Sequence, residues 1–272
     1  MNQTNITKRL ATFKDKKFTV VKVLSLQEQA DIEIMFKVIN GFEVQNKNFE
    51  IVTEIYQDIL NTLNQSSPDH QLFRQIMEFV STFNAFLNHW NTYLIREFGK
   101  TSKNYLAFKE STGEQFDKVF GYRFLYGLRN YIHHCGMPNI IIHSKLGQKE
   151  ELIHELIVDQ EELKVGMDWH KTIKKDFESM PNKFDIFPYL KDLIKSISAI
   201  HKVAINNMDM VRLLLCAKKM LAFKEFRGSE DNELVFLEWL EFNGLGKPTN
   251  FNFVQFRFNL AEYLVRQINP II

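Results

Sequence analysis

Apolar residues recur every three or four positions along most of the chain, and this periodicity is typical of amphipathic helices. In the first half of the chain it predicts helices over residues 25–40, 48–63, 69–98, 102–109 and 116–135. In the second half it predicts a helical turn over 159–164 and helices over 169–179, 188–205, 209–226, 232–242 and 253–268. The chain is therefore predicted to be mainly α.

Capping residues set the expected ends of the early helices. Ser25 and Glu28 match a capping box, and Gly41 is expected to close the helix that they open. Ser67 and Pro68 suit the cap and the first position of a later helix. The N-terminal region is thus expected to hold two separate helices before the break at residues 64–69.

Segments rich in β-branched residues interrupt the helical pattern. Lys17–Leu24 predicts a strand or an extended arm. Asn139–Ser144 and Leu152–Val158 flank an expected turn at Gly147, so residues 139–158 are predicted to form a small β-hairpin. We expect three regions: an N-terminal arm with helices (1–66), a helical core with the hairpin (67–205) and a C-terminal helical block (206–272).

Composition narrows the class of protein. The 25 phenylalanines suit packing between helices, and only 6 prolines and 11 glycines argue against disorder and against an all-β sandwich. No apolar run approaches the roughly 18 residues of a membrane span, and the N-terminus lacks the apolar core of a signal peptide. Cys135 and Cys216 lie far apart, which indicates free, buried thiols in a reducing compartment. We expect a cytoplasmic protein with no membrane partner.

Residues 116–139 form the stretch around which the chain is organised. Thr112 and Gln115 match a second capping box, and Gly136 followed by Pro138 ends the helix. Apolar residues cover most sides of this helix, which predicts a central, largely buried element.

Four polar residues, Arg129, Asn130, His133 and His134, lie within six positions at the end of the predicted central helix. A polar cluster on a buried helix is either well paired or functional. Residues 96–129 also contain seven Lys or Arg against four Asp or Glu. That surplus is compatible with a phosphate ligand, although a solvated helix face explains it equally well. Earlier in the same helix, Gly121 and Gly127 are expected to let another backbone come close.

The sequence from Arg129 to His134 resembles the motif of the HEPN superfamily of helical ribonucleases: an arginine, a polar residue, three to five further residues, and a histidine. Arg129, Asn130 and His134 match these positions, and the resemblance covers roughly residues 72–142. It implies a HEPN-like antiparallel helical bundle, here with the hairpin insertion and extra C-terminal helices. The stretch FLYGLRNYIHH is similar to bacterial defence-like members of that superfamily.

The resemblance implies metal-independent cleavage of RNA, in phage defence or toxin-like growth control. The ribose 2′-hydroxyl would attack the adjacent phosphate, with His134 as general acid/base, Arg129 as phosphate clamp and Asn130 as orienting group. No cofactor and no metal ion would be needed. Three further residues are candidates for supporting roles, namely His133, Arg123 and Tyr126. The expected partners are an RNA substrate, a second copy of the chain and an antitoxin or regulatory protein.

Helix geometry bears on how these groups meet. Residues five apart lie about 140° apart around a helix, so Arg129 and His134 converge in one chain only if the last turn is loosened. They can also meet across a two-fold axis, as the resemblance implies for a homodimer formed through the motif-bearing helix. We prefer the dimer, because one copy supplies only one reliable acid/base group.

Two other interpretations remain open. In the first, the chain is a non-catalytic helical interaction module whose Arg-His cluster only bonds helix-end carbonyls. In the second, His133, His134, Cys135 and His143 hold a metal ion, although neighbouring ring nitrogens on one helix diverge. Solvent exposure distinguishes the first interpretation from the nuclease hypothesis, because capping side chains are covered and catalytic ones are open.

Overall fold

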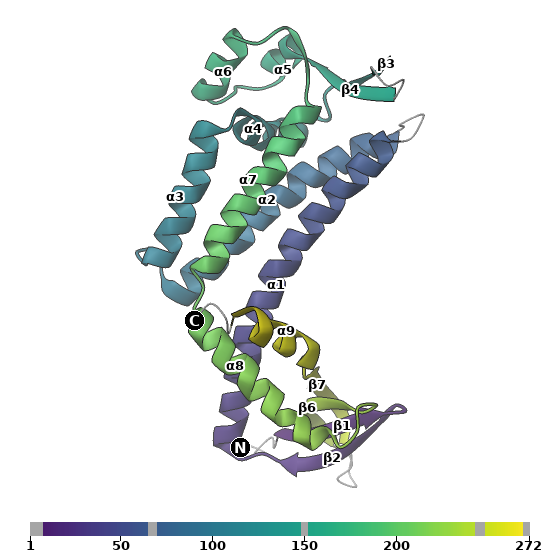
Figure 1. Ribbon diagram of the computed structural model, residues 1–272, viewed down its shortest axis with the longest axis vertical. Helices are drawn as coiled ribbons and strands as arrows, with labels where there is room; N and C mark the ends of the chain where they lie inside the picture. The colour runs from purple at the N-terminus through teal and green to yellow at the C-terminus, as the bar shows by residue number, and fades with distance from the viewer. Residues whose placement is uncertain (1–7, 65–69, 148–151, 243–247, 269–272) are drawn as a thin grey trace. The chain divides into compact units, whose positions relative to one another are not determined.

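The computed structural model describes residues 8–64, 70–147, 152–242 and 248–268, and most of these residues are helical. Figure 1 shows the elements in chain order. The chain divides into two compact units, one made of residues 1–43 with 209–272 and the other of residues 44–208. As far as the structure describes the chain, no helix is both long and apolar enough to cross a bilayer.

A four-stranded antiparallel sheet joins the two ends of the chain in the first unit. Its strand order is β2-β1-β6-β7, built from β1 (Lys8–Lys14), β2 (Lys17–Val23), β6 (Glu233–Phe242) and β7 (Pro248–Gln255). Leu10 of β1 lies opposite Phe236 of β6 and is fully buried. This pairing explains why residues up to 43 belong with the C-terminal segment. The sequence-based division instead groups them with residues 44–66.

The sequence predicted β2 but missed its partner β1. The two strands are joined by Asp15 and Lys16, whose φ values are 49° and 60°. Positive φ at both central residues is the geometry of the tight hairpin turn, and the usual sequence signal of that turn is Asn-Gly or Asp-Gly. With lysine in place of glycine, the turn signal was absent.

The predicted helix over residues 232–242 is wrong, because these residues form strand β6. The run Leu234–Leu237 is buried on both sides, so the alternation that marks a half-exposed strand is lost. Ala11, Val235 and Leu237 are fully buried on one face of the sheet. The C-terminal block therefore contributes two strands, β6 and β7, to the sheet, together with α8 (Met210–Ala222), a 3₁₀ turn (Phe223–Arg227) and α9 (Phe258–Ile268).

Gly41 does not end a helix, contrary to the prediction. Helix α1 runs without interruption from Leu26 to Leu63. Buried residues on either side of the glycine, Ile39 and Phe42, keep the helical period. The predicted capping box is confirmed at the start of α1, where the Glu28 carboxylate accepts from the Ser25 backbone N–H at 2.9 Å. The predicted cap at Ser67 and Pro68 lies outside the described residues.

Helices dominate the second unit, which also holds a small sheet. Helices α2 (His70–Phe98), α3 (Lys103–Lys118), α4 (Phe120–Cys135) and α7 (Phe187–Asn206) pack around large buried side chains of α2 such as Phe79, Phe83, Phe86 and Trp90. The predicted hairpin is confirmed as β3 (Ile141–Leu146) and β4 (Leu152–Asp159), extended by the short strand β5 (Lys183–Asp185). Two short helices, α5 (Gln160–Gly166) and α6 (Lys171–Glu178), lie between β4 and β5 in the chain.

The central helix begins later than predicted. Helix α3 continues through Gly113 to Lys118, and Thr112 donates to the Lys109 carbonyl at 2.9 Å instead of capping a new helix. The break falls at Val119, whose extended backbone (φ −112°, ψ 107°) ends α3 and starts α4. Ser102 caps α3 by accepting from the Tyr105 N–H at 3.2 Å.

The HEPN resemblance implies an antiparallel helical bundle, but α4 does not lie antiparallel to the long helix α2. In Figure 1, α4 is viewed almost end-on while α2, α3 and α7 run across the view, so α4 crosses the others. A methyl group placed on Gly121 would lie 2.8 Å from the Asp192 Cβ and 3.0 Å from the Tyr189 Cα. Gly121 therefore permits a close approach of the α7 backbone, as predicted. Gly127 instead accommodates a side chain, since a methyl there would lie 2.7 Å from the Trp169 ring.

We predict that His201 makes the second unit sensitive to acid. Its ring stacks on Phe49 with centroids 4.1 Å apart, and burial lowers its pKa from 6.5 to about 4. The folded protein favours the neutral imidazole, and this contributes to the free energy of unfolding. The contribution is fully present above pH 6.5 and is lost as the pH falls toward 4. The loss between pH 7.5 and pH 5 is expected to be about 2 kcal/mol.

Urea denaturation of wild type and of His201→Leu at both pH values checks this expectation. All other titrating groups are common to the two proteins, so the variant's stability should fall less over the same interval. Parallel losses in the two proteins would contradict the assignment.

Candidate active site at the end of helix α4

Helix α4 is held by packing along most of its length. Phe124, Leu125 and Leu128 are fully buried, and the Phe124 ring stacks on Trp169 at a centroid distance of 5.9 Å. Tyr131 continues this contact toward the end of the helix, with its ring 6.0 Å from that of Trp169. The predicted central and mostly buried helix is confirmed, and its last turn emerges from this packing into solvent.

The last turn of α4 is a regular α-helical turn. Gly136 has φ 88° and donates its N–H to the Ile132 carbonyl at 3.1 Å, so it closes the helix as predicted. Because the helix keeps its period up to Cys135, Arg129 and His134 project about 140° apart around its axis. One copy of the chain therefore does not bring these two groups together.

Arg129 and Asn130 form a pair at the edge of the packed region. The Arg129 Nη1 donates to the Asn130 Oδ1 at 3.1 Å, and both residues are half-buried. The Arg129 Nε is buried and has no hydrogen-bond partner within the described part of the chain. The guanidinium is thus partly oriented by Asn130, and it keeps donors that no described residue uses.

His133 and His134 are exposed at the end of α4. Among residues 8–64, 70–147, 152–242 and 248–268, neither imidazole has a hydrogen bond or an ion pair. Both rings are therefore open to solvent and to a ligand. This exposure argues against the structural interpretation, in which these side chains would be covered and would bond helix-end carbonyls.

Arg123 has a structural role that the sequence did not reveal. Its Nε and Nη2 donate to the two carboxylate oxygens of Asp176 at 2.6 and 2.8 Å. Its Nη1 also donates to the carbonyls of Phe116 and Asp117 at the end of α3, at 3.2 Å each. The hydrogen bond to Asp176 raises the pKa of Arg123. Arg123 therefore ties α3 and α6 to α4, and these contacts occupy its Nε, Nη1 and Nη2 atoms.

Tyr126 lies on the exposed side of α4, one turn before Arg129. It is 40% exposed, and its ring makes edge contacts with Phe83 and Phe116 at centroid distances of 6.3 Å. At about 100° per residue, Tyr126, Asn130 and His133 fall on one face of the helix. This arrangement extends the candidate site along α4 toward α3.

A metal site at this position finds no support in the geometry. Cys135, predicted to be buried, is exposed, and its Sγ donates to the Gly166 carbonyl at 2.8 Å. His143 lies on β3, where its Nδ1 is 3.1 Å from a Glu155 carboxylate oxygen. Within the described ranges, no three His, Cys, Asp or Glu side chains are grouped so that they could hold a metal ion.

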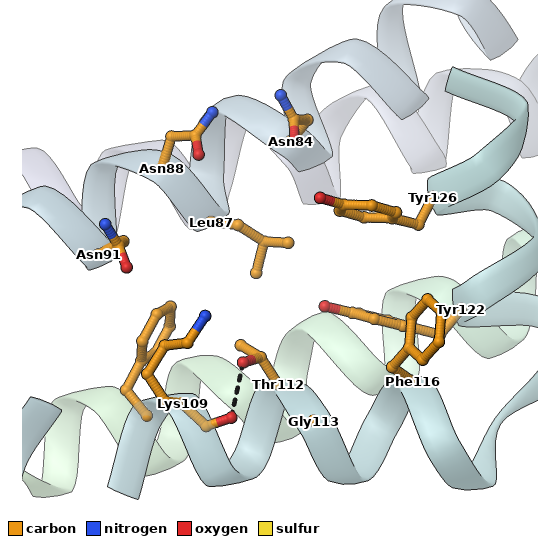
Figure 2. Close-up of a pocket in the computed structure, with 11 residues that line it drawn as sticks. Asn84, Leu87, Asn88, Asn91, Lys109, Thr112, Gly113, Phe116, Tyr122 and Tyr126 are labelled. Carbon is orange, nitrogen blue, oxygen red and sulfur yellow. Dashed lines mark hydrogen bonds between the residues drawn. The ribbon is translucent and has the colours of Figure 1, made fainter. Parts of the chain in front are cut away.

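A pocket beside α4 was not predicted from the sequence. Figure 2 shows it between α2 and α3, with Tyr122 and Tyr126 of α4 at one end. Three asparagines of α2, Asn84, Asn88 and Asn91, line it at a spacing of four and three residues. The helical spacing of these amides is a sequence signal for a polar pocket lining. It was missed because the large aromatic residues on the other faces of α2 dominate the pattern.

Comparisons of the chain with protein-family models, with curated proteins and with solved structures found no match. The residues and geometry of α4 are therefore the basis for assigning a function.

Proposed function

We propose that this protein is a metal-independent endoribonuclease whose active site is composed of groups from two copies of the chain. The observation that carries the proposal is the end of α4, where an exposed His134 and a partly oriented Arg129 lie on one short segment. Since these groups diverge by about 140° within one chain, a second α4 related by two-fold symmetry is the arrangement that would bring them together.

The chemistry follows from the two side chains. A neutral imidazole accepts the proton of a ribose 2′-hydroxyl as its oxygen attacks the adjacent phosphorus. The P–O5′ bond then breaks, an imidazolium returns a proton to the 5′-oxygen, and the products are a 2′,3′-cyclic phosphate and a 5′-hydroxyl. The guanidinium of Arg129 would stabilise the extra negative charge on the phosphoryl oxygens in the transition state. Because DNA lacks the 2′-hydroxyl, it would not be cleaved by this route.

The remaining parts of the hypothesis follow from this chemistry and from the HEPN resemblance. The substrate is RNA, and the second partner is another copy of the chain that contributes its own α4. A nuclease of this kind would be toxic to its own cell, which fits growth control or phage defence and a regulatory or antitoxin protein that restrains it.

Mixing two inactive variants is expected to restore cleavage. In a two-fold dimer of Arg129→Ala with His134→Ala, one composite site loses both groups and the other keeps both. Random pairing of equal amounts should therefore recover about a quarter of the wild-type activity. The measurement is cleavage of a labelled single-stranded RNA in the presence of EDTA, with detection of the cyclic phosphate.

The matched control pairs Arg129→Ala with the double variant Arg129→Ala/His134→Ala, because that combination contains no intact site. If differently tagged subunits are shown to pair and yet activity stays absent in the first mixture, the two groups do not act across an interface. A wild-type protein that cleaves no RNA in EDTA would overturn the proposed function itself.

A further inference from the structure

Strand β7 is the last strand of the sheet in the first unit, so one of its two edges has no strand beside it among the described residues. Every residue from Thr249 to Gln255 is exposed. The backbone N–H and C=O groups along such an edge are free to pair with a further strand. The outer edge of β7 is therefore a surface on which an extended segment can add to the sheet.

The two edges of this sheet differ in charge. Strand β2, at the opposite edge, carries Lys17 and Lys22, and lysines on an edge strand oppose pairing with another chain. Strand β7 has the sequence PTNFNFVQ and contains no charged residue. Its one proline stands at the first position, where it leaves the rest of the edge able to pair. Of the two edges, β7 is thus the one without protection.

Exposed aromatic side chains accompany the free edge. Phe251 and Phe253 are 42% and 45% exposed. They share one face of the sheet, because they lie opposite Trp239 and Leu237 of β6. The Phe18 ring of β2 reaches across this face, with its centroid 5.0 Å from that of Phe251 and 5.4 Å from that of Phe253. The inner sides of the two β7 rings are packed, and their outer sides are left for a partner to cover.

We propose that β7 pairs with β7 of a second copy of the chain, antiparallel about a two-fold axis, to form one continuous eight-stranded sheet. In a two-fold contact every residue near the axis meets its own copy, so any charge there would repel itself. A neutral strand is what this occupant requires, whereas a charged foreign segment would call for the opposite charge on β7.

The sequence of β7 suits a register centred on Asn252. In that register Phe251 of each copy lies opposite Phe253 of the other, which makes two cross-strand aromatic pairs on one face. The two Asn252 side chains lie side by side on the opposite face, where each carboxamide can donate to the other. Both faces of the strand thus match themselves across the axis.

The contact is small, so its strength is expected to be modest. With roughly 200 Å² for one aromatic side chain, the exposed parts of Phe251 and Phe253 amount to roughly 90 Å² each. Four such rings and two strand backbones should bury less than the roughly 1,200 Å² at which standard interfaces begin. We therefore expect a concentration-dependent dimer with a dissociation constant in the micromolar range.

This contact does not depend on the proposed cleavage of RNA. Strand β7 belongs to the first unit and α4 to the second, so the two proposed dimer contacts use different surfaces. If both form, each copy has two different two-fold contacts and the assembly grows beyond a dimer. A change at β7 should then lower the mass of the assembly, whatever its size, and leave the α4 contact in place.

Sedimentation velocity of the full-length protein, from about 1 to 100 µM, tests the inference with a charge swap at Asn252. The average mass of wild type should rise about twofold over this range. Asn252→Lys and Asn252→Glu should each remove the rise, because like charges meet at the axis, and an equimolar mixture of the two should restore it. Asn252 is exposed and has no hydrogen bond to a described residue, so both variants should fold.

The matched control is Thr19→Lys, which places the same charge on an exposed residue of the β2 edge and should associate as wild type does. Hydrogen exchange gives a second measurement, since the β7 amides should be protected at the high concentration and not at the low one. A wild-type mass equal to that of Asn252→Lys, or a mixture of the two charged variants that stays at the lower mass, would overturn the inference. Protection of β7 at every concentration would mean that the chain covers its own edge, and would overturn it as well.

Discussion

His134→Ala is expected to cleave single-stranded RNA about 10²–10⁴-fold more slowly than wild type, the usual contribution of a positioned general acid/base. The imidazole is exposed at the end of α4, and no described residue occupies its ring nitrogens. Its removal should leave folding unchanged, because the exposed ring makes no hydrogen bond or ion pair to a described residue. The measurement is the single-turnover rate in EDTA, alongside the melting temperature of the same preparation.

His143→Ala provides the matched control for this substitution. His143 is also an exposed histidine, but it lies on β3 and pairs with Glu155. Its replacement should leave the cleavage rate within about twofold of wild type, since surface substitutions of this kind change little. Equal rates for wild type and His134→Ala would exclude His134 from the chemistry, whatever activity the protein has.

The helical half of the fold could be predicted from sequence because periodicity reports burial directly. The boundaries failed where tertiary packing overrode a local signal. Gly41 is a helix-ending residue by propensity, yet the buried Ile39 and Phe42 carry α1 across it. Gly113 is likewise inside α3, and the real break at Val119 contains neither glycine nor proline.

The sheet of the first unit was the part least accessible from sequence. Strand β6 is apolar on both faces, and leucine and glutamate in it favour helix by propensity. Its identity as a strand depends on β1, which is more than two hundred residues away in the chain. A pairing of that kind leaves no local signal in either segment.

At the candidate site, the sequence motif singled out the candidate residues but did not predict their contacts. The order Arg129, Asn130, His134 was sufficient to single out the end of α4, and the exposure of His134 agrees with a catalytic role. The partner of Arg123 could not be found in advance, since Asp176 lies 53 residues away. Whether an arginine in a basic helix binds a ligand or holds the fold therefore depends on long-range contacts that spacing does not report.

The contacts of Arg123 lead to the second large effect. Arg123→Met is expected to lower the free energy of unfolding by about 3 kcal/mol, the lower end of the range for breaking a buried ion pair. The arginine side chain is 10% exposed and the Asp176 side chain 24%, so the carboxylate left behind is partly solvated. The two carbonyls at the end of α3 also lose their donor. Urea denaturation followed by circular dichroism measures the change.

A second ion pair of the same region serves as the comparison. Lys118 pairs with Glu114 at 2.6 Å, but these side chains are 70% and 53% exposed. Lys118→Met should therefore change the free energy of unfolding far less than Arg123→Met does. Asp176→Leu combined with Arg123→Met should recover part of the loss, because no unpaired carboxylate remains.

Cleavage assays of Arg123→Met and of Lys118→Met decide between a structural and a functional role for Arg123. If Arg123 only holds α3 and α6 against α4, the cleavage rate of Arg123→Met should fall in proportion to its folded fraction. The rate should then equal that of wild type at low urea, where the variant is fully folded. A variant that unfolds at the wild-type urea concentration but no longer cleaves RNA would instead place Arg123 at the substrate. The bidentate contact with Asp176 favours the structural outcome, because a guanidinium committed to a carboxylate and two carbonyls has little left to offer a phosphate.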